Sequence, residues 1–316
     1  MINLVSRRYW FFLLSALVII PGLISLAIPP GLRLSVDFLG GTQTELRFSG
    51  QPVGEGVARP VSEGELRAVL ARHELGDAII QSTGQGTWLV RTREIKPDSP
   101  LKQEVYADFR SEFGSFEEVS VLGLDPEVAR RVAQNSVYAV IIAAIGILIY
   151  ISIAFYKVPS PFRYGVSAVV ALVHDAIVVL GLFSILGRFL NIEVDLLFLT
   201  AVLTVIGFSV HDTIVVFDRI RENIGRYYGQ SFMEIVNHSL IQTMGRSLTT
   251  SLTVVLTMLA LFLLGGITTK LFALALLVGI ISGTYSSIFN ASMLLVVWEN
   301  GELGRFFRRL IPGRAS

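Results

Sequence analysis

Six apolar stretches constrain this chain more than any other feature of its sequence. They lie at roughly residues 10–29, 133–155, 162–186, 194–217, 243–264 and 268–298. A helix needs about 20 mostly apolar residues to cross the hydrocarbon core of a bilayer. The sequence therefore predicts a polytopic α-helical membrane protein with six transmembrane helices. The last stretch is long enough to tilt or to extend past the bilayer.

The composition supports a membrane protein and excludes several classes of function. Hydrophobic residues make up 52% of the 316 residues and charged residues only 16%, whereas soluble domains carry about 25% charged residues. The formal net charge of +1 gives no dominant basic face, so we expect no nucleic-acid partner. The chain has no cysteine, which excludes disulfides, thiol catalysis and cysteine-based metal sites and leaves the redox compartment open.

The first apolar stretch, YWFFLLSALVIIPGLISLAI, follows Arg7 and Arg8. The alternative to a membrane helix is a cleaved signal peptide, whose apolar core is about 7–15 residues long and precedes a small-residue cleavage site. This stretch is longer, and the sequence PPGLRL follows it. We therefore favour a retained membrane helix.

Lysine and arginine residues near the ends of the stretches predict the orientation of the chain. If the N-terminus is inside, the short outer loops carry only Arg188 and Lys270. The inner segments then carry Arg7, Arg8, Lys157, Arg163, Arg219, Arg221, Arg226, Arg305, Arg308, Arg309 and Arg314. This asymmetry predicts that both termini are cytoplasmic and that the polar segment after the first helix lies outside the cytoplasm.

The chain divides into four parts on this interpretation. The N-terminus and first transmembrane helix occupy 1–30, an extracytoplasmic domain occupies 31–132, the other five helices lie within 133–298, and a basic cytoplasmic tail occupies 299–316. The inner loop at about 218–242 mixes charged residues with apolar residues at helical spacing. It is predicted to be an amphipathic helix on the membrane surface, and the tail is predicted to be a surface anchor near anionic lipid.

The outer domain shows a readable order of elements. Strand patterns lie at 42–50, 78–83, 87–95 and 116–123, and helix patterns lie at 62–75 and 101–114. Ser62 and Glu65 form a possible capping box at the start of the first helix. The order β-α-β-β-α-β predicts a ferredoxin-like α+β domain. It contains no convincing nucleophile–base pair, so a binding or lever domain is favoured over an enzyme.

Ionisable residues interrupt the third and fourth apolar stretches. His174 and Asp175 stand in ALVHDAIVVLG, and His211 and Asp212 stand in GFSVHDTIVVFD. A carboxylate at bilayer depth costs about 2.5–3.5 kcal/mol, so it must face the bundle, be paired or be neutral. An aspartate that gains and loses a cationic neighbour acts as a proton switch. The alternative for both carboxylates is a structural group that links helices by hydrogen bonds, and Asp175 has no obvious polar companion on its own helix face.

Two further interpretations concern cations. Neighbouring His and Asp residues point about 100° apart on a helix, so the two pairs do not converge well on one ion and no metal is expected.

The fifth stretch places Arg246, Thr250, Thr253 and Thr257 on one helix face. This face could line a hydrated path beside the carboxylates. The alternative is an arginine at the membrane interface that reaches towards phosphate.

Four motifs become specific when they are taken together: VDFLGGT after the first stretch, ALVHD in the third, GFSVHDTIVVFDRIREN in the fourth and GRSLTTSLT in the fifth. With one large outer domain between the first two of six helices, they resemble the SecF family of protein-export membrane proteins in the resistance-nodulation-division superfamily. The resemblance extends over nearly the whole chain. The sister SecD family is similar but has a much larger outer region.

The resemblance implies a proton-driven function with named residues. It implies that Asp212 and Arg246 transport protons, with no cofactor other than protons as the coupling ion, and that the chain is not an enzyme. It implies location in the bacterial cytoplasmic (inner) membrane. Possible proton-relay residues are His211, Asp175, His174 and Thr213. Many relatives carry asparagine at the position of His211.

The resemblance also implies partners. The chain would pair with SecD to complete twelve helices, and the complex would pull preproteins outward after SecA and the SecYEG channel have acted. Further partners would be YajC, YidC, the unfolded preprotein and membrane lipid. Gly40 and Gly41 are interpreted as a hinge between the first helix and the outer domain. Two alternatives stay open: half of a small-molecule proton antiporter, and a passive subunit that stabilises the translocon.

Overall fold

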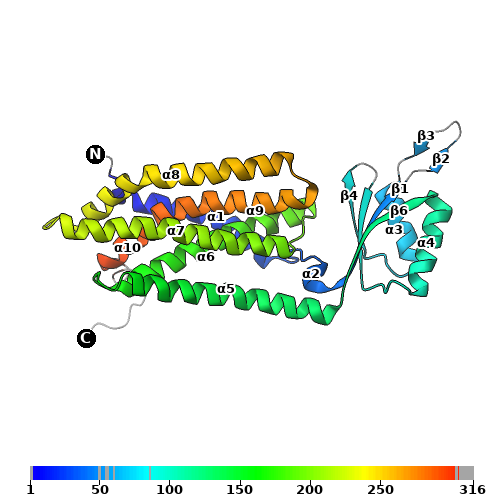
Figure 1. The fold of residues 1–316 in the computed structure, drawn as a ribbon, viewed down its shortest axis with the longest axis horizontal. Coiled ribbons are helices and arrows are strands. Elements are labelled where there is room, and N and C mark those ends of the chain that lie inside the picture. Colours follow the sequence, from blue (N-terminus) through cyan, green and yellow to red (C-terminus); the bar gives the residue numbers. More distant parts are fainter. Residues whose placement is uncertain are drawn as a thin grey trace. The chain divides into compact units, whose positions relative to one another are not determined.

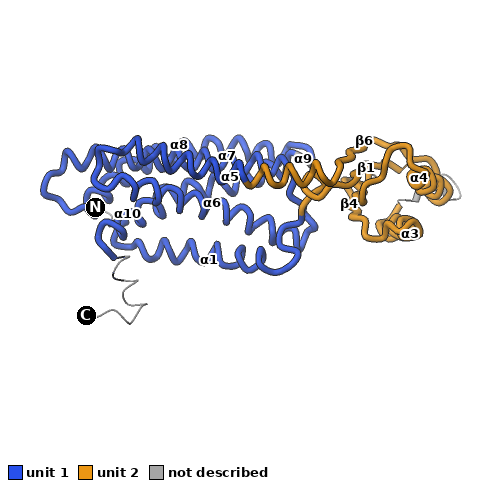
Figure 2. The backbone as a smooth tube through the Cα atoms, turned by 90° about the horizontal axis from the view of Figure 1, so that it is seen from below, with its two compact units in different colours: residues 1–33, 138–316 blue, residues 34–137 orange. Residues whose placement is uncertain are grey.

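The computed structural model describes residues 3–48, 51–53, 57–59, 61–84, 87–302 and 305. The chain forms two compact units, residues 1–33 with 138–316 and residues 34–137 (Figure 2). The first unit is a helix bundle and the second is a small α+β domain. The predicted fold class, six membrane helices with one α+β domain, is confirmed.

Six helices of the chain are long and apolar enough to cross a membrane (Figure 1). A short 3₁₀ turn, Val5–Arg7, precedes the first of them. The last one is continuous but changes its winding, because a π-helix η2 separates α9 from α10. The helices are α1 Arg8–Ala27, α5 Pro126–Ala154, α6 Pro161–Leu190, α7 Leu196–Arg226, α8 Phe232–Leu264, α9 Ile267–Tyr285, η2 Ser286–Ala291 and α10 Ser292–Glu299.

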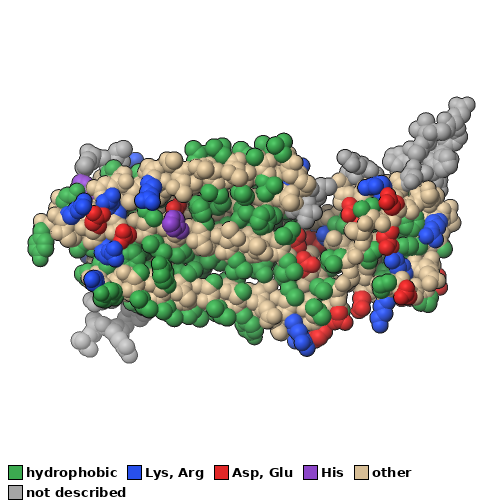
Figure 3. All heavy atoms as spheres, in the orientation of Figure 1, with side chains coloured by type: hydrophobic (Ala, Val, Ile, Leu, Met, Phe, Trp, Pro, Cys, Tyr) green, Lys and Arg blue, Asp and Glu red, His purple; other side chains and the backbone are tan. Residues whose placement is uncertain are grey.

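Three helices form the interior of the bundle: α6, α7 and the segment from α9 to α10. About half or more of the most apolar window of each is buried, and small residues bring their backbones close together. The first helix joins them at a glycine pair, where a Cβ on Gly181 would lie 2.7 Å from the Cα of Gly22. In contrast, α5 and α8 are mostly exposed. On the face shown in Figure 3, hydrophobic side chains cover the length of the helices, as a surrounding bilayer requires.

The segment at 218–242 differs from its prediction. It is not a separate surface helix, because α7 continues to Arg226 and α8 already begins at Phe232. The Ser231 side chain and Glu234 form a capping box that starts α8. Asn223 then ties the two helix ends together, since its Nδ2 donates to Ser239 Oγ at 2.8 Å. Local apolar spacing was correctly helical, but it did not show that the helices were continuations of the membrane spans.

The predicted basic tail occupies residues 299–316. Residues 303–304 and 306–316 lie outside the described residues. Glu302 is described, and its carboxylate accepts a hydrogen bond from Arg8 at 2.8 Å. Tyr9 Oη donates to the same carboxylate at 2.7 Å. The beginning of the tail is therefore fixed to the N-terminal end of α1.

The second unit has a four-stranded antiparallel sheet in the order β4-β5-β1-β6. Each βαβ unit of this domain is split by a strand of the other, as the ferredoxin-like arrangement requires. A short helix, α2 Val36–Leu39, and a two-stranded pair, β2 Gln51–Val53 with β3 Val57–Arg59, were not predicted. The other elements are β1 Gly41–Phe48, α3 Glu63–Arg72, β4 Ile79–Gly84, β5 Thr87–Thr92, α4 Pro100–Phe113 and β6 Phe116–Leu124.

The core of this domain lies between the two helices and the sheet. The predicted apolar face of α3, which includes Leu66, Val69 and Leu70, is almost wholly buried against it. Phe48 and Phe109 meet edge to face at 5.8 Å between ring centroids. The capping box of Ser62 and Glu65 is present as predicted.

Gly40 and Gly41 occupy tightly packed positions. Both have positive φ angles, 76° and 121°, which are unfavourable for residues with a side chain. A Cβ on Gly40 would lie 2.6 Å from the Cα of Pro126, and one on Gly41 would lie 2.4 Å from the carbonyl oxygen of Thr92. Close packing explains why both positions need glycine. Their proposed role as a hinge stays a prediction.

An ionic contact on the domain surface gives a prediction about pH. Lys102 Nζ lies 2.9 Å from Glu118 Oε2, and Tyr106 Oη donates to the same carboxylate. Partial burial would raise the pKa of Glu118, but the hydrogen bonds from Tyr106 and Lys102 outweigh it and lower this pKa. The contribution to stability is therefore present above the unfolded pKa of about 4.3 and is lost as the pH falls through the folded value.

We expect Glu118→Gln to lower the free energy of unfolding of this domain at neutral pH by roughly 0.5 kcal/mol or less, because a third of the side chain is exposed to solvent. At a pH below the lowered folded pKa of Glu118, where the carboxylate is protonated in both states, the difference should vanish. Urea titrations of the full chain followed by the fluorescence of Trp88, which packs on the core, measure both values. An equal loss of unfolding free energy at both pH values would show that the ionised carboxylate of Glu118 does not stabilise the domain.

Candidate functional site

Asp212 lies inside the bundle on α7 and is only 2% exposed. The carboxylate accepts a single weak hydrogen bond among the described residues, from Ser251 Oγ of α8 at 3.3 Å. Ser251 in turn accepts a hydrogen bond from Thr284 Oγ1 of α9 at 2.6 Å. The carboxylate is thus enclosed by three helices but poorly supplied with donors.

Arg246 does not lie against Asp212 in this chain. Its side chain is exposed on α8, and within the described ranges it makes no hydrogen bond or ion pair with another side chain. The hydroxyls of Thr250, Thr253 and Thr257 are also exposed and donate only to carbonyls of their own helix. The predicted stripe exists, but it points away from the interior of the chain.

A second stripe of small and polar residues is exposed on the neighbouring helix α7. His211, one residue before the buried Asp212, belongs to it. The stripe consists of Thr200, Thr204, Gly207 and His211. We call this stripe and the stripe of Arg246, Thr250, Thr253 and Thr257 together the polar face. Polar side chains at bilayer depth are costly unless they contact protein or water, so this face requires a cover.

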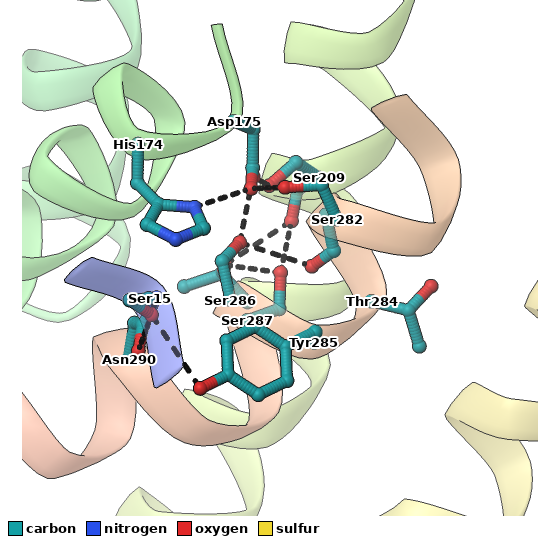
Figure 4. Close-up of polar contacts among 12 residues, drawn as sticks. Ser15, His174, Asp175, Ser209, Ser282, Thr284, Tyr285, Ser286, Ser287 and Asn290 are labelled. Atoms are coloured by element: carbon teal, nitrogen blue, oxygen red, sulfur yellow. Dashed lines mark hydrogen bonds and ion pairs between the residues drawn. The ribbon is translucent and has the colours of Figure 1, made fainter. Parts of the chain in front are cut away.

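The carboxylate of Asp175 has four polar contacts with neighbouring side chains (Figure 4). It is completely buried. Its Oδ2 accepts from Ser209 Oγ of α7 and from Ser286 Oγ of η2, both at 2.6 Å. Its Oδ1 accepts from Ser282 Oγ of α9 at 2.7 Å and lies 3.0 Å from Nδ1 of His174. Asp175 therefore joins three helices.

The π-helix η2 supplies further contacts of the same kind. Thr213 Oγ1 of α7 donates to Ser287 Oγ at 2.9 Å. Asn290 Nδ2 donates to Ser15 Oγ of α1 at 2.8 Å. A π-helix inserts an extra residue into a turn of an α-helix and is frequently found at functional sites. Here the wider turn directs neighbouring polar side chains towards different helices.

The structure thus separates the predicted site residues into two groups. His174 and Asp175 are in contact, and Thr213 joins the same hydroxyl network. Asp212 is buried beside it, whereas His211 and Arg246 are exposed. The sequence interpretation assigned Ser286 to a small-residue packing face and did not connect any serine with Asp175, because these serines come from other helices and no sequence spacing connects them with it. The run of hydroxyls in SGTYSS, residues 282–287, was the signal that could have found them.

Comparisons with known proteins agree with this architecture. The family described as protein export membrane protein SecD/SecF, C-terminal, matches residues 104–301. The protein translocase subunit SecF of Thermobaculum terrenum is 50% identical over the full length of both chains. That of Anaerolinea thermophila is 44% identical over 98% of each chain.

Fused relatives and solved structures contain a larger chain. The protein translocase subunit SecDF of Bacillus subtilis is 34% identical over 94% of this chain, which matches only 38% of its length. A crystal structure of SecDF, a translocon-associated membrane protein from Thermus thermophilus, is 31% identical with a TM-score of 0.79. The match covers 95% of this chain and 39% of that one. The present chain therefore spans about two fifths of the SecDF chains that it resembles.

The six membrane helices, the ferredoxin-like domain, the full-length similarity to SecF subunits and the structural likeness to SecDF lead to one conclusion: the chain belongs to the SecD/SecF family of protein-export membrane proteins and has a role in protein translocation.

Proposed function

We propose that this chain is the SecF-type half of a SecDF complex, which uses the proton-motive force to promote preprotein translocation through the Sec channel after the SecA-driven step. The observation that carries the proposal is the position of Asp212, which is buried next to the exposed polar face and has one weak donor among the described residues. In this proposal Asp212 carries the proton and Arg246 is its cationic partner. Protons are the coupling ion, and the chain catalyses no chemical reaction.

The exposed polar face explains why a partner is needed. Its hydroxyls, histidine and arginine would cost free energy against lipid, whereas another set of helices would bury and pair them. The SecDF relatives carry a further region about one and a half times as long as this chain, and a SecD subunit would supply it here. Closure by SecD would exclude lipid from the arginine and hold it near the carboxylate.

The cycle follows from the charges. With Arg246 near, Asp212 is ionised; when the helices shift and Arg246 withdraws, Asp212 takes up a proton from outside. The movement of one charge through 100 mV releases about 2.3 kcal/mol. This free energy would move the outer domain at Gly40 and Gly41 and draw the preprotein outward.

The topology of the proposal comes from the basic residues. The excess of arginine at one set of helix ends supports a multi-pass arrangement in the cytoplasmic (inner) membrane with both termini in the cytoplasm. Unit 2 then lies on the outer side, where it can meet an emerging unfolded preprotein. SecYEG, YajC, YidC and membrane lipid are the further partners of this proposal.

Proton flux in liposomes tests the proposed function. The chain would be reconstituted with SecD, and flux would be recorded under an imposed proton gradient with and without unfolded preprotein. We expect Asp212→Asn to abolish the flux, because an amide side chain does not bind and release protons as a carboxylate does. Asp218→Asn is the matched control, since Asp218 lies on the same helix but is exposed and paired with Arg221.

Each result has a definite meaning. Flux that depends on Asp212 and rises with preprotein supports the proposal. Flux that depends on Asp212 but ignores preprotein would favour a small-molecule antiporter. Preprotein binding without flux in any variant would favour a passive subunit that stabilises the translocon.

A further inference from the structure

A cavity of about 510 Å³ lies beside the buried carboxylate Asp175, between α1, α6, η2 and α10. Its walls are mostly apolar, with Phe12, Val173 and Leu294 among them. Ser15, His174 and Asn290 are polar residues that line it. A water in such a space needs two to four polar partners, and these side chains can provide them.

One nitrogen of His174 has no partner in this arrangement. The side chain is nine-tenths buried, and Nδ1 is occupied by Asp175 at 3.0 Å. Nε2 is fully buried and has no hydrogen-bond partner among the described residues. Figure 4 shows this nitrogen turned away from Asp175, on the side of Ser15 and Asn290. A buried ring nitrogen without a partner is costly, so the position calls for a polar group that enters from the cavity.

The charge of the His174–Asp175 pair also indicates that His174 binds a proton. An ionised carboxylate accepts about four hydrogen bonds, and Asp175 has four such contacts: three serine hydroxyls and His174. In the described part of the chain His174 is the only basic side chain that contacts it. With neutral His174 the pair would hold one uncompensated negative charge in the bundle, which is strongly unfavourable. One bound proton makes the pair neutral overall.

No other ionisable group among the described residues neutralises the negative charge of Asp175 by direct contact. Tyr285 packs beside His174 at 6.3 Å between ring centroids, but its hydroxyl donates to the carbonyl of Phe11 at 2.7 Å. At the far end of the cavity, Glu302 is bound by Arg8. Among the described residues, the ionisable side chains that line the cavity besides His174 are Tyr9 and Glu302, and the ionisable residue of α7 next to this network is Asp212. In the ranges that the structure describes, none of them hydrogen-bonds to His174 or Asp175.

We propose that His174 and Asp175 form a second proton-binding site, separate from Asp212, which exchanges protons with water in the cavity through Nε2 of His174. The proton adds to Nε2 of a neutral imidazole, and the resulting imidazolium keeps its Nδ1–H on Asp175. Release returns the proton to water and restores the negative charge. Nothing else is consumed or formed. The site's use in transport rests on the proposed proton-driven function, but its ability to bind a proton does not.

The serine hydroxyls of α7, α9 and η2 hold the carboxylate of Asp175 in both states of the site. If the Nδ1 proton moves from His174 to Asp175, the carboxylic acid donates to Nδ1 and only this one contact reverses its direction. The segment that carries Ser282 and Ser286 also carries Ser287, which accepts from Thr213, the residue after Asp212. Hydrogen bonds therefore connect the second site to the helix that carries the first.

Nitrogen-15 NMR of the histidine rings tests the site directly. The complex with SecD, labelled at histidine, would be studied in lipid, and His174→Gln would identify the His174 signals. We expect the spectra of the unchanged complex to show the imidazolium pattern for His174 in the acidic range. Asp175→Asn should remove most of that pattern, because the counter-charge is gone. Asp212→Asn, in the matched His211–Asp212 pair, should leave it unchanged.

Two results would overturn the inference. The first is a His174 ring that stays neutral throughout the acidic range in the unchanged complex. This measurement needs no carboxylate variant, so it tests the site even if Asp175→Asn does not fold. The other is an imidazolium signal that survives in folded Asp175→Asn.

Proton flux separates this inference from the proposed function. We expect a loss of flux in Asp175→Asn as well as in Asp212→Asn. Loss in Asp212→Asn alone would keep the proposed function and overturn the use of the second site in transport. Normal flux in Asp212→Asn would overturn the proposed function, while the NMR result would still decide whether His174 and Asp175 bind a proton.

Discussion

Arg246→Leu is expected to stop proton-coupled transport almost as completely as Asp212→Asn, although the two side chains do not touch in this chain. Among the described residues Asp212 has a single hydroxyl donor, at 3.3 Å, so an ionised carboxylate there needs a cation from elsewhere. Arg246 is exposed on the next helix and would be turned inward when SecD covers the polar face. A charge-assisted hydrogen bond contributes about 1.5–3 kcal/mol, so we expect proton flux in the reconstituted complex to fall roughly tenfold to a hundredfold.

Two variants control this experiment. Arg246→Lys keeps the charge but loses the planar guanidinium, so it should retain part of the flux. Thr249→Ala removes an exposed hydroxyl that bonds only Gly245 of its own helix at 2.9 Å, and it should behave as the unchanged chain. Normal flux in Arg246→Leu together with lost flux in Asp212→Asn would show that Asp212 works without this arginine.

The fold was predictable where its signal is local. A run of about 20 apolar residues is enough to identify a membrane helix. The sequence predicted six such helices, and the structure contains six candidate membrane spans among the described residues. The strands and helices of the outer domain can be recognised from the spacing of their apolar residues over a few positions. Ser62 marks the beginning of one helix and Gly114 the end of another. The segment at 218–242 was misread because helical spacing is the same in a surface helix and in the end of a membrane helix. Only the position of the break at 227–231 distinguishes them.

The site was predictable only in part, because its geometry depends on contacts between helices. The cost of a buried charge identified Asp175 and Asp212 without any structure. It could not show that Asp175 receives donors from α7, α9 and η2, whereas in the part of the chain that the structure describes Asp212 receives one. It also could not show that His174 faces inward and His211 outward, since both precede an aspartate in nearly the same local sequence. Helix rotation, which the tertiary packing sets, separates these two pairs.

Gly181→Leu is expected to have the largest effect on the stability of the bundle. The backbones of α1 and α6 meet at Gly22 and Gly181, where a Cβ on Gly181 would lie 2.7 Å from a backbone atom that cannot rotate away. The leucine would push α1 outward and break the hydrogen bond between Ser25 Oγ and Ser184 Oγ, now 2.8 Å long. Overpacking of this kind costs about 1–3 kcal/mol in cores that can adjust, and we expect about 3 kcal/mol or more here.

Thermal unfolding of the purified chain in detergent, together with protease resistance of α1, would measure this effect. Gly146→Leu is the matched control, since Gly146 also lies in a membrane helix but its Cβ would meet nothing within 4 Å. Equal stability of the two variants would mean that α1 does not need its contact with α6. A selective loss in Gly181→Leu would also open the wall of the cavity beside His174, because α1 forms one side of it. The same variant would then expose the second proton site to lipid, which links the packing of the first helix to the chemistry of the bundle.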